Sequence, residues 1–247
     1  MVHLEVSGRC QLNCPYCYVP RQQGQELSTD RWKSIITDLA GYGVFQVTLG
    51  GGEPTLRDDL KPLALHVRRS GMNLCMTTNG IDLPRLKSDL LCLFSQVNVS
   101  YHAAAGRDGL VKALAHLRDC GTPAGVNVLL TRAYGAELAD IAAIADAFGA
   151  ELLLLSAKDV RDAIPPGRVF AQAKKLHERG IRVAVDGLSC SGVLADFCLQ
   201  KVRFCTVDPA GHVMPCSFVR KPLGNLVEKP FGEIWRSRGR QIPCPYA

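Results

Sequence analysis

The sequence predicts an α/β fold: an open, TIM-like partial (β/α)6 barrel followed by a small module made of a β-hairpin and a helix. Strand-like apolar runs alternate with amphipathic helical segments about six times between residues 2 and 185. Each helical crossover returns the chain to the same edge of a sheet, so the strands are expected to be parallel. Six units are too few to close a barrel of eight. The last predicted strand ends at 185, and the alternation has stopped by Ala195. We therefore place the barrel at 1–186 and the module at 187–247.

The predicted elements follow one another in a regular order. Strands are expected at 2–7, 44–49, 73–77, 96–101, 125–130, 152–155 and, less regularly, 181–185. Helices are expected at 28–40, 60–69, 84–93, 110–118, 137–148 and 169–179. Ser28 is a typical N-cap for the first helix, whose apolar face comprises Trp32, Ile35, Ile36 and Leu39. The hairpin is expected within 198–216 and the last helix at 231–236.

Composition and charge narrow the class of protein. The net charge is +6, but the basic residues are dispersed among acids, and aromatic residues make up only 6%. Both features argue against a nucleic-acid partner. No apolar run approaches the roughly 18 residues that a membrane span needs. The chain begins directly with a strand pattern, without a signal peptide, which predicts a cytoplasmic protein.

The eleven cysteines are unevenly distributed. Three lie within 10–17, and five lie between Cys190 and Cys244. Three more, which we expect to be small core residues, are scattered in apolar surroundings: Cys75, Cys92 and Cys120. A chain this large without an export signal is not a typical disulfide scaffold, so metal ligation is the better explanation for the two clusters.

The first cluster has the spacing C-x3-C-x2-C, formed by Cys10, Cys14 and Cys17. Three thiolates on a short loop can bind three corners of an iron–sulfur cubane, which leaves the fourth iron open. Structural zinc is the alternative, but zinc usually takes four ligands from paired C-x2-C units. With the aromatic Tyr16 before its last cysteine, the motif resembles the signature of the radical S-adenosylmethionine (radical SAM) superfamily. The resemblance implies a 4Fe-4S cluster whose open iron chelates S-adenosyl-L-methionine, with the backbone of Tyr16 near the adenine.

A second motif, the glycine-rich turn at 50–54, follows the second predicted strand. Glycine allows a close approach of the backbone to a ligand. The turn resembles the GGE-P motif by which the same family holds the amino group of S-adenosylmethionine, which implicates Gly51, Gly52 and Glu53. The alternative is an ordinary turn at a strand end.

Polar residues also follow the next predicted strands. By the same resemblance, Thr78 and Asn79 after the third strand and Ser100 after the fourth would face the carboxylate and ribose of the cofactor. Asn127 on the fifth strand is a further candidate. Ordinary polar capping of strand ends remains the alternative for each of them.

The C-terminal segment contains the spacing C-x12-G-x4-C, formed by Cys198, Gly211 and Cys216. It resembles SPASM and twitch domains, in which an auxiliary iron–sulfur cluster, usually 4Fe-4S, would be bound by Cys198, Cys216 and Cys244. Cys190 and Cys205 compete for the fourth position. We favour Cys190, because Cys205 lies in a predicted hairpin strand with core parity. The end at Ala247 favours a shorter twitch domain with one cluster.

The two resemblances together imply an enzyme that reductively cleaves S-adenosylmethionine to a 5′-deoxyadenosyl radical and abstracts hydrogen from a substrate. Peptide oxidation or cross-linking is the first expectation, and dehydrogenation or rearrangement of a small hydroxylated metabolite is the second. A reductase such as flavodoxin or ferredoxin would supply electrons. A non-catalytic iron–sulfur carrier or regulator is the alternative of another class, but it would have no use for the glycine-rich turn.

Overall fold

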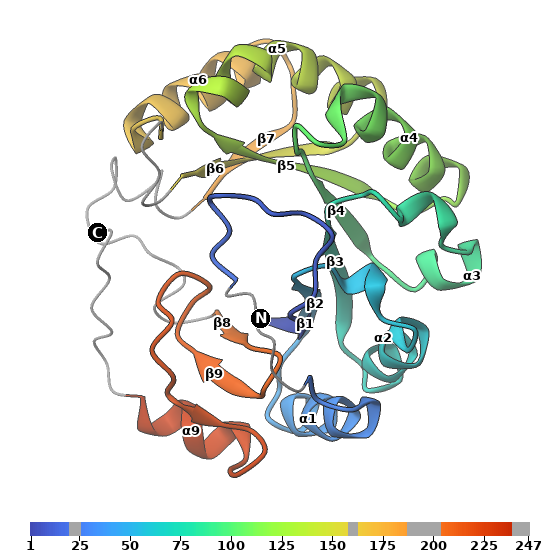
Figure 1. Ribbon diagram of the computed structural model, residues 1–247, viewed down its shortest axis with the longest axis vertical. Helices are drawn as coiled ribbons and strands as arrows, with labels where there is room; N and C mark the ends of the chain where they lie inside the picture. Colours follow the sequence, from blue (N-terminus) through green and yellow to red (C-terminus); the bar gives the residue numbers. More distant parts are fainter. Residues whose placement is uncertain (20–25, 158–162, 187–203, 239–247) are drawn as a thin grey trace. The chain divides into compact units, whose positions relative to one another are not determined.

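A computed structural model describes residues 1–19, 26–157, 163–186 and 204–238 of the chain (Figure 1). These residues divide into two compact units. Unit one comprises Met1–Thr78, Leu86–Ser95 and the described part of Leu199–Pro245. Unit two comprises Asn79–Arg85 and the described part of Gln96–Cys198.

Unit one is built on a sheet in which the predicted C-terminal hairpin continues the barrel strands. Its strands, in spatial order, are β10 (Gly224–Asn225), β9 (His212–Met214), β8 (Cys205–Val207), β1 (Val2–Ser7), β2 (Gln46–Gly51) and β3 (Asn73–Thr78). β1 is parallel to β2 on one side and to β8 on the other, whereas β8 and β9 are antiparallel. Figure 1 shows the hairpin beside β1. The hairpin is therefore hydrogen-bonded to the strand that leads into the cysteine loop.

The helices of unit one bury the faces that the sequence pattern predicts. α1 (Thr29–Gly41) begins after Ser28, whose side chain accepts a hydrogen bond from the Arg31 amide. The helix buries the four apolar residues expected of it. α2 (Leu60–Arg69) buries Leu60, Leu63, Ala64 and Val67, and it follows the short 3-10 helix η1 (Pro54–Leu56). The last described helix is α9 (Phe231–Ser237).

The helix predicted at 84–93 is wrong in extent. Two short pieces take its place, η2 (Leu83–Arg85) in unit two and α3 (Ser88–Leu91) in unit one. Lys87 has an extended backbone, with ψ of 150°, and this breaks the helical hydrogen bonding between them. The apolar periodicity of the segment thus reflects burial of separate turns.

Unit two contains four parallel strands joined by helices: β4 (Gln96–Ser100), β5 (Ala124–Leu130), β6 (Glu151–Ser156) and β7 (Val183–Val185). The helices are α4 (Gly106–Asp119), α5 (Arg132–Ala147) and α6 (Pro166–Glu178). α5 begins five residues earlier than predicted, because the Thr131 side chain caps it by accepting a hydrogen bond from the Tyr134 amide. The β-α alternation that predicted an α/β fold with parallel strands is confirmed.

The described residues bear on two further expectations. Cys75 is buried as predicted, but Cys92 is exposed, and its thiol lies 3.6 Å from the Asp89 carbonyl at the end of α3. The prediction of a core position for Cys92 is wrong, because the shortened helix leaves it at the surface. Among the helices of the described part, none combines the length and the hydrophobicity that a membrane crossing requires.

Candidate cofactor site

The cysteine loop leaves the sheet at the end of β1. Cys10 and Cys14 are half-buried and Cys17 is exposed, and the Cys17 amide donates to the Cys14 carbonyl at 3.2 Å. Within the described residues, no group of three or more His, Cys, Asp or Glu side chains is arranged to hold a single metal ion. An iron–sulfur cubane is wider than one ion, and three soft thiolates on one short loop are the donors it takes. The donor set therefore fits a cluster.

The glycine-rich turn lies directly against the start of this loop. The Gly52 amide donates to the Ser7 carbonyl at 2.7 Å, and the Glu53 amide donates to the Arg9 carbonyl at 2.8 Å. Gly51 has φ of +116°, and an added Cβ there would lie 2.4 Å from the Ser7 oxygen. A Cβ at Gly52 would lie 2.2 Å from the Arg9 oxygen. The glycines are thus required by contact with the cysteine loop itself, a reason that the sequence did not reveal.

Glu53 and Thr78, predicted at neighbouring strand ends, are brought together. Both are buried, and the Thr78 hydroxyl donates to Glu53 Oε1 at 2.8 Å. The amide and the hydroxyl of Thr55 donate to the same oxygen at 3.1 and 2.7 Å. The sequence analysis did not predict a role for Thr55. Its position directly after Glu53 and Pro54 was the only feature that could have indicated one. These three bonds to one oxygen fix the orientation of the Glu53 carboxylate.

The remaining predicted contacts to S-adenosylmethionine belong to unit two. Ser100 and Asn127 are register partners on β4 and β5. Asn127 is buried, and its Oδ1 has no hydrogen-bond partner among the described residues. A buried acceptor of this kind suits a donor group from a ligand, such as a ribose hydroxyl. Asn79 is different, because its Oδ1 accepts from the Ile81 amide at 2.9 Å, as in an ordinary turn.

The predicted turn of the C-terminal hairpin is present. Gly211 has φ of +90°, and its amide donates to the Asp208 carbonyl at 3.0 Å. Cys216 is buried after β9, and its sulfur accepts from the Val219 amide at 3.2 Å. Cys205 is buried in β8, where burial raises the pKa of its thiol to about 12. Three other predicted ligands, Cys190, Cys198 and Cys244, lie outside the described residues.

A charged pair that the sequence analysis missed joins the hairpin module to β1. Both oxygens of Glu5 accept from the Arg220 guanidinium, at 2.6 and 2.9 Å. Glu5 is fully buried, and burial raises its pKa, although Arg220 opposes that effect. His3 is on the same face of β1, and its ring fills the space beside Gly50. In the sequence, polar His3, Glu5 and Ser7 alternate with apolar residues, and this pattern could have indicated a polar face on the strand.

Comparisons with known proteins agree with both motif sets. A model described as the radical SAM superfamily matches residues 4–131, and the SPASM model, described as an iron-sulfur cluster-binding domain, matches residues 198–242. The chain is 28% identical to the PqqA peptide cyclase of Rhodopseudomonas palustris, over 96% of this chain and 73% of that protein. It is also 28% identical to the mycofactocin maturase MftC of Mycolicibacterium smegmatis, over 94% of this chain and 69% of that protein.

Solved structures show the same fold. SuiB of Streptococcus suis, in a crystal structure bound to the precursor peptide SuiA, has a TM-score of 0.79 at 15% identity. The similarity covers 97% of this chain and 65% of that one, so the chain spans less than two thirds of SuiB. The structure described as native anSMEcpe with bound AdoMet and Cp18Cys peptide has a TM-score of 0.71 over 97% of this chain and 81% of that one. These neighbours are partial TIM barrels, which confirms the predicted fold class.

Proposed function

This chain belongs to the radical SAM superfamily, whose model matches more than half of it, and from that premise we propose that it modifies a peptide by hydrogen abstraction. The reaction is an oxidation or a cross-linking at carbon. The family and the SPASM domain imply an iron–sulfur cluster in each part of the chain, together with S-adenosylmethionine. When bound, these cofactors supply the hydrogen-abstracting radical, while the protein supplies binding, orientation and exclusion of water.

The observation that carries the proposal is the direct hydrogen bonding between the two motifs. The backbone of the glycine-rich turn binds the start of the cysteine loop through Ser7 and Arg9. We assign Cys10, Cys14 and Cys17 as cluster ligands. The predicted contacts to S-adenosylmethionine are Tyr16, Gly51, Gly52, Glu53, Thr78, Asn79, Ser100 and Asn127. The buried Oδ1 of Asn127, which has no hydrogen-bond partner in the described part of the chain, supports its place in that list, whereas the side-chain oxygen of Asn79 already accepts within its own turn.

The peptide substrate rests on the relatives. Two curated relatives are named for acting on peptides or as a maturase, and each aligns with at least 94% of this chain. SuiB, which has the same fold, is described with a bound precursor peptide. A small hydroxylated metabolite is the competing substrate class. We further propose a flavodoxin or ferredoxin as the electron donor and the cytoplasm as the location.

The auxiliary cluster is proposed to lie in the C-terminal module. We assign Cys198, Cys216 and Cys244 as its ligands, with Cys190 as the fourth. The core position of Cys205, with a raised pKa that opposes thiolate formation, supports leaving it out. The proposed domain division, 1–186 and 187–247, follows the two modules, although the hairpin is hydrogen-bonded to β1.

Deuterium transfer tests the function. The enzyme is reconstituted anaerobically, reduced with dithionite and incubated with candidate precursor peptides or polyols that carry deuterium at carbon. Mass spectrometry then follows the label into 5′-deoxyadenosine. We expect label from a peptide, and none with Cys14→Ala, because that variant lacks one of the proposed cluster ligands. Cys14 is half-buried on a loop outside the core, so its substitution should leave the fold intact. Transfer from a polyol alone would replace the peptide with a small metabolite, and methyl transfer without label would refute hydrogen abstraction.

A further inference from the structure

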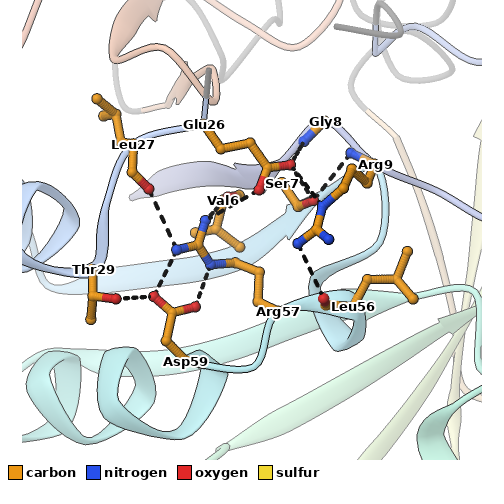
Figure 2. A network of polar contacts seen from close by, with 10 residues as sticks. All are labelled: Val6, Ser7, Gly8, Arg9, Glu26, Leu27, Thr29, Leu56, Arg57 and Asp59. Atoms are coloured by element: carbon orange, nitrogen blue, oxygen red, sulfur yellow. Dashed lines mark hydrogen bonds and ion pairs between the residues drawn. The ribbon is translucent and has the colours of Figure 1, made fainter. Parts of the chain in front are cut away.

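A partly buried network of charged and polar groups closes the base of the cysteine loop (Figure 2). It joins the end of β1, where the loop begins, to residues 26–29, where the chain returns to α1. The third partner is the segment that directly follows the glycine-rich turn, 56–59. Two side chains, Arg57 and Glu26, make most of its contacts.

Arg57 binds both sides of the loop base at once. Its Nη1 donates to the Val6 carbonyl at 2.7 Å, and its Nη2 lies 3.5 Å from the Leu27 carbonyl. The same guanidinium donates to both oxygens of Asp59, at 2.7 Å each. Asp59 in turn accepts from the Thr29 hydroxyl at the start of α1. Only 7% of the Arg57 side chain is exposed, so these bonds are not those of a solvated surface pair.

Glu26 completes the closure from the other side. Its Oε1 accepts from the Ser7 hydroxyl at 2.7 Å and from the Gly8 amide at 2.9 Å. Its Oε2 lies 3.6 Å from Arg57 Nη1. Burial alone would raise the pKa of Glu26, but the bonds from Ser7 and Gly8 and the nearby arginines hold it below its usual value. The carboxylate is therefore ionised and bound directly to the backbone that precedes Cys10.

We propose that Arg57 and Glu26 are positioning residues that clamp the base of the cysteine loop and so hold Cys10 against the glycine-rich turn in the geometry that binds the cluster. Arg57 is suited to this because it follows η1, whose first residue ends the Gly-Gly-Glu-Pro turn. One guanidinium thus ties the turn to both sides of the loop base. A lysine has one ammonium on a flexible stem and cannot satisfy two carbonyls and a bidentate carboxylate together. This inference rests on the proposed role of Cys10, Cys14 and Cys17.

The variants are Arg57→Met, Arg57→Lys and Glu26→Gln, with Arg107→Met as the matched control. Arg107 pairs with Asp140 in unit two, and both of those side chains are more than half exposed. The first readout uses the cluster-free full chain, in which hydrogen exchange of the Gly52 and Glu53 amides reports their bonds to Ser7 and Arg9. We expect exchange about tenfold or more faster in both Arg57 variants, because a buried charged hydrogen-bonding group is lost or misplaced. The control should exchange as wild type does.

The second readout uses the reconstituted enzyme. Loss of iron from the Cys10 cluster to a chelator should be about tenfold faster in the Arg57 variants, as when groups that orient metal ligands are removed. The change that S-adenosylmethionine produces in the electron paramagnetic resonance spectrum of the reduced cluster should also be altered. Arg57→Lys keeps the charge, so its melting temperature should fall less than that of Arg57→Met while its spectral response is altered as much, a separation that a merely structural role would not produce. Glu26→Gln should give a smaller effect of the same kind, because the amide oxygen still accepts from Ser7.

Two outcomes would overturn the clamp. One is amide exchange and iron loss in Arg57→Met and Arg57→Lys that match those of Arg107→Met. The other is an unaltered spectral response to S-adenosylmethionine in variants whose loop base exchanges faster. Failure of the proposed cluster ligands looks different, since wild-type enzyme would then bind no cluster at Cys10, Cys14 and Cys17. In that case Arg57 could not act by positioning cluster ligands, and the proposed clamp would also be refuted.

Discussion

Removing Arg220 should destabilise unit one in a way that depends on pH. The substitution Arg220→Met keeps most of the volume of the side chain but leaves Glu5 without the two bonds, at 2.6 and 2.9 Å, that compensate its charge. Glu5 is fully buried, and 21% of the Arg220 side chain is exposed. The pair joins β1 to the segment after Cys216, 215 residues apart in the chain. Its loss should therefore loosen the hairpin module on the sheet.

The magnitude follows from burial. Breaking a buried ion pair from one side costs about 3–5 kcal/mol, and partial exposure of Arg220 favours the lower end, about 3 kcal/mol at pH 8. In the wild-type enzyme, burial already raises the pKa of Glu5 and Arg220 opposes this. Without Arg220 that pKa rises further, so the folded state of the variant holds its proton to higher pH. The variant therefore loses more stability than wild type as pH rises, and at pH 5 the difference should shrink to about 1–2 kcal/mol.

Anaerobic thermal unfolding at pH 5, 6.5 and 8 measures the effect. A loss of 3 kcal/mol corresponds to a melting temperature lower by about 6–12 °C in a chain of this size. The double variant Glu5→Gln/Arg220→Met should recover at least about 1 kcal/mol, because the buried charge is gone. A decrease of the melting temperature that is the same at pH 5 and pH 8, or no recovery in the double variant, would refute the reasoning.

Three further predictions concern the same unit. Burial, with a smaller effect of the nearby Arg220 charge, lowers the pKa of His3 to about 4. The unfolded chain therefore binds more protons than the folded chain between pH 6.5 and 4, so the free energy of unfolding should fall by up to about 3 kcal/mol on acidification through that window. His3→Gln should flatten the measured profile of stability against pH. Gly52→Ala should reduce the iron content of the Cys10 cluster, because the added Cβ would lie 2.2 Å from a backbone oxygen. Gly167→Ala should not, because an added Cβ there would have no atom within 4 Å. Equal iron content in the two variants would contradict this prediction. Cys216→Ala should lower iron toward one cluster and loosen the C-terminal module, while Cys205→Ala should do neither; loss of a cluster in Cys205→Ala would make that residue a ligand.

Local patterns in the sequence determined much of the fold. Ser28 capping a helix with four periodic apolar residues predicted α1, and the structure shows that cap and that face. The alternation of such helices with strands predicted a parallel α/β fold, which the structure and its neighbours confirm. The spacing of the cysteines and of the glycine-rich turn indicated the family, which the family models confirm. Each of these patterns involves residues that are close to one another in the sequence. Periodicity and spacing reflect local backbone geometry, so local patterns are sufficient to predict these features.

Tertiary structure decided the rest. The periodicity at 84–93 predicted one helix, but the extended backbone of Lys87 divides the segment into two short helical pieces. The glycines of the turn proved necessary because the cysteine loop packs on them. Arg57, Glu26 and Glu5 are not among the residues that the sequence motifs singled out. Apart from Asp59, which is two residues from Arg57, their partners lie between 17 and 215 residues away. The sequence does not show which group will pair with a given charged side chain. Such pairs form only when distant backbone segments fold together and exclude water.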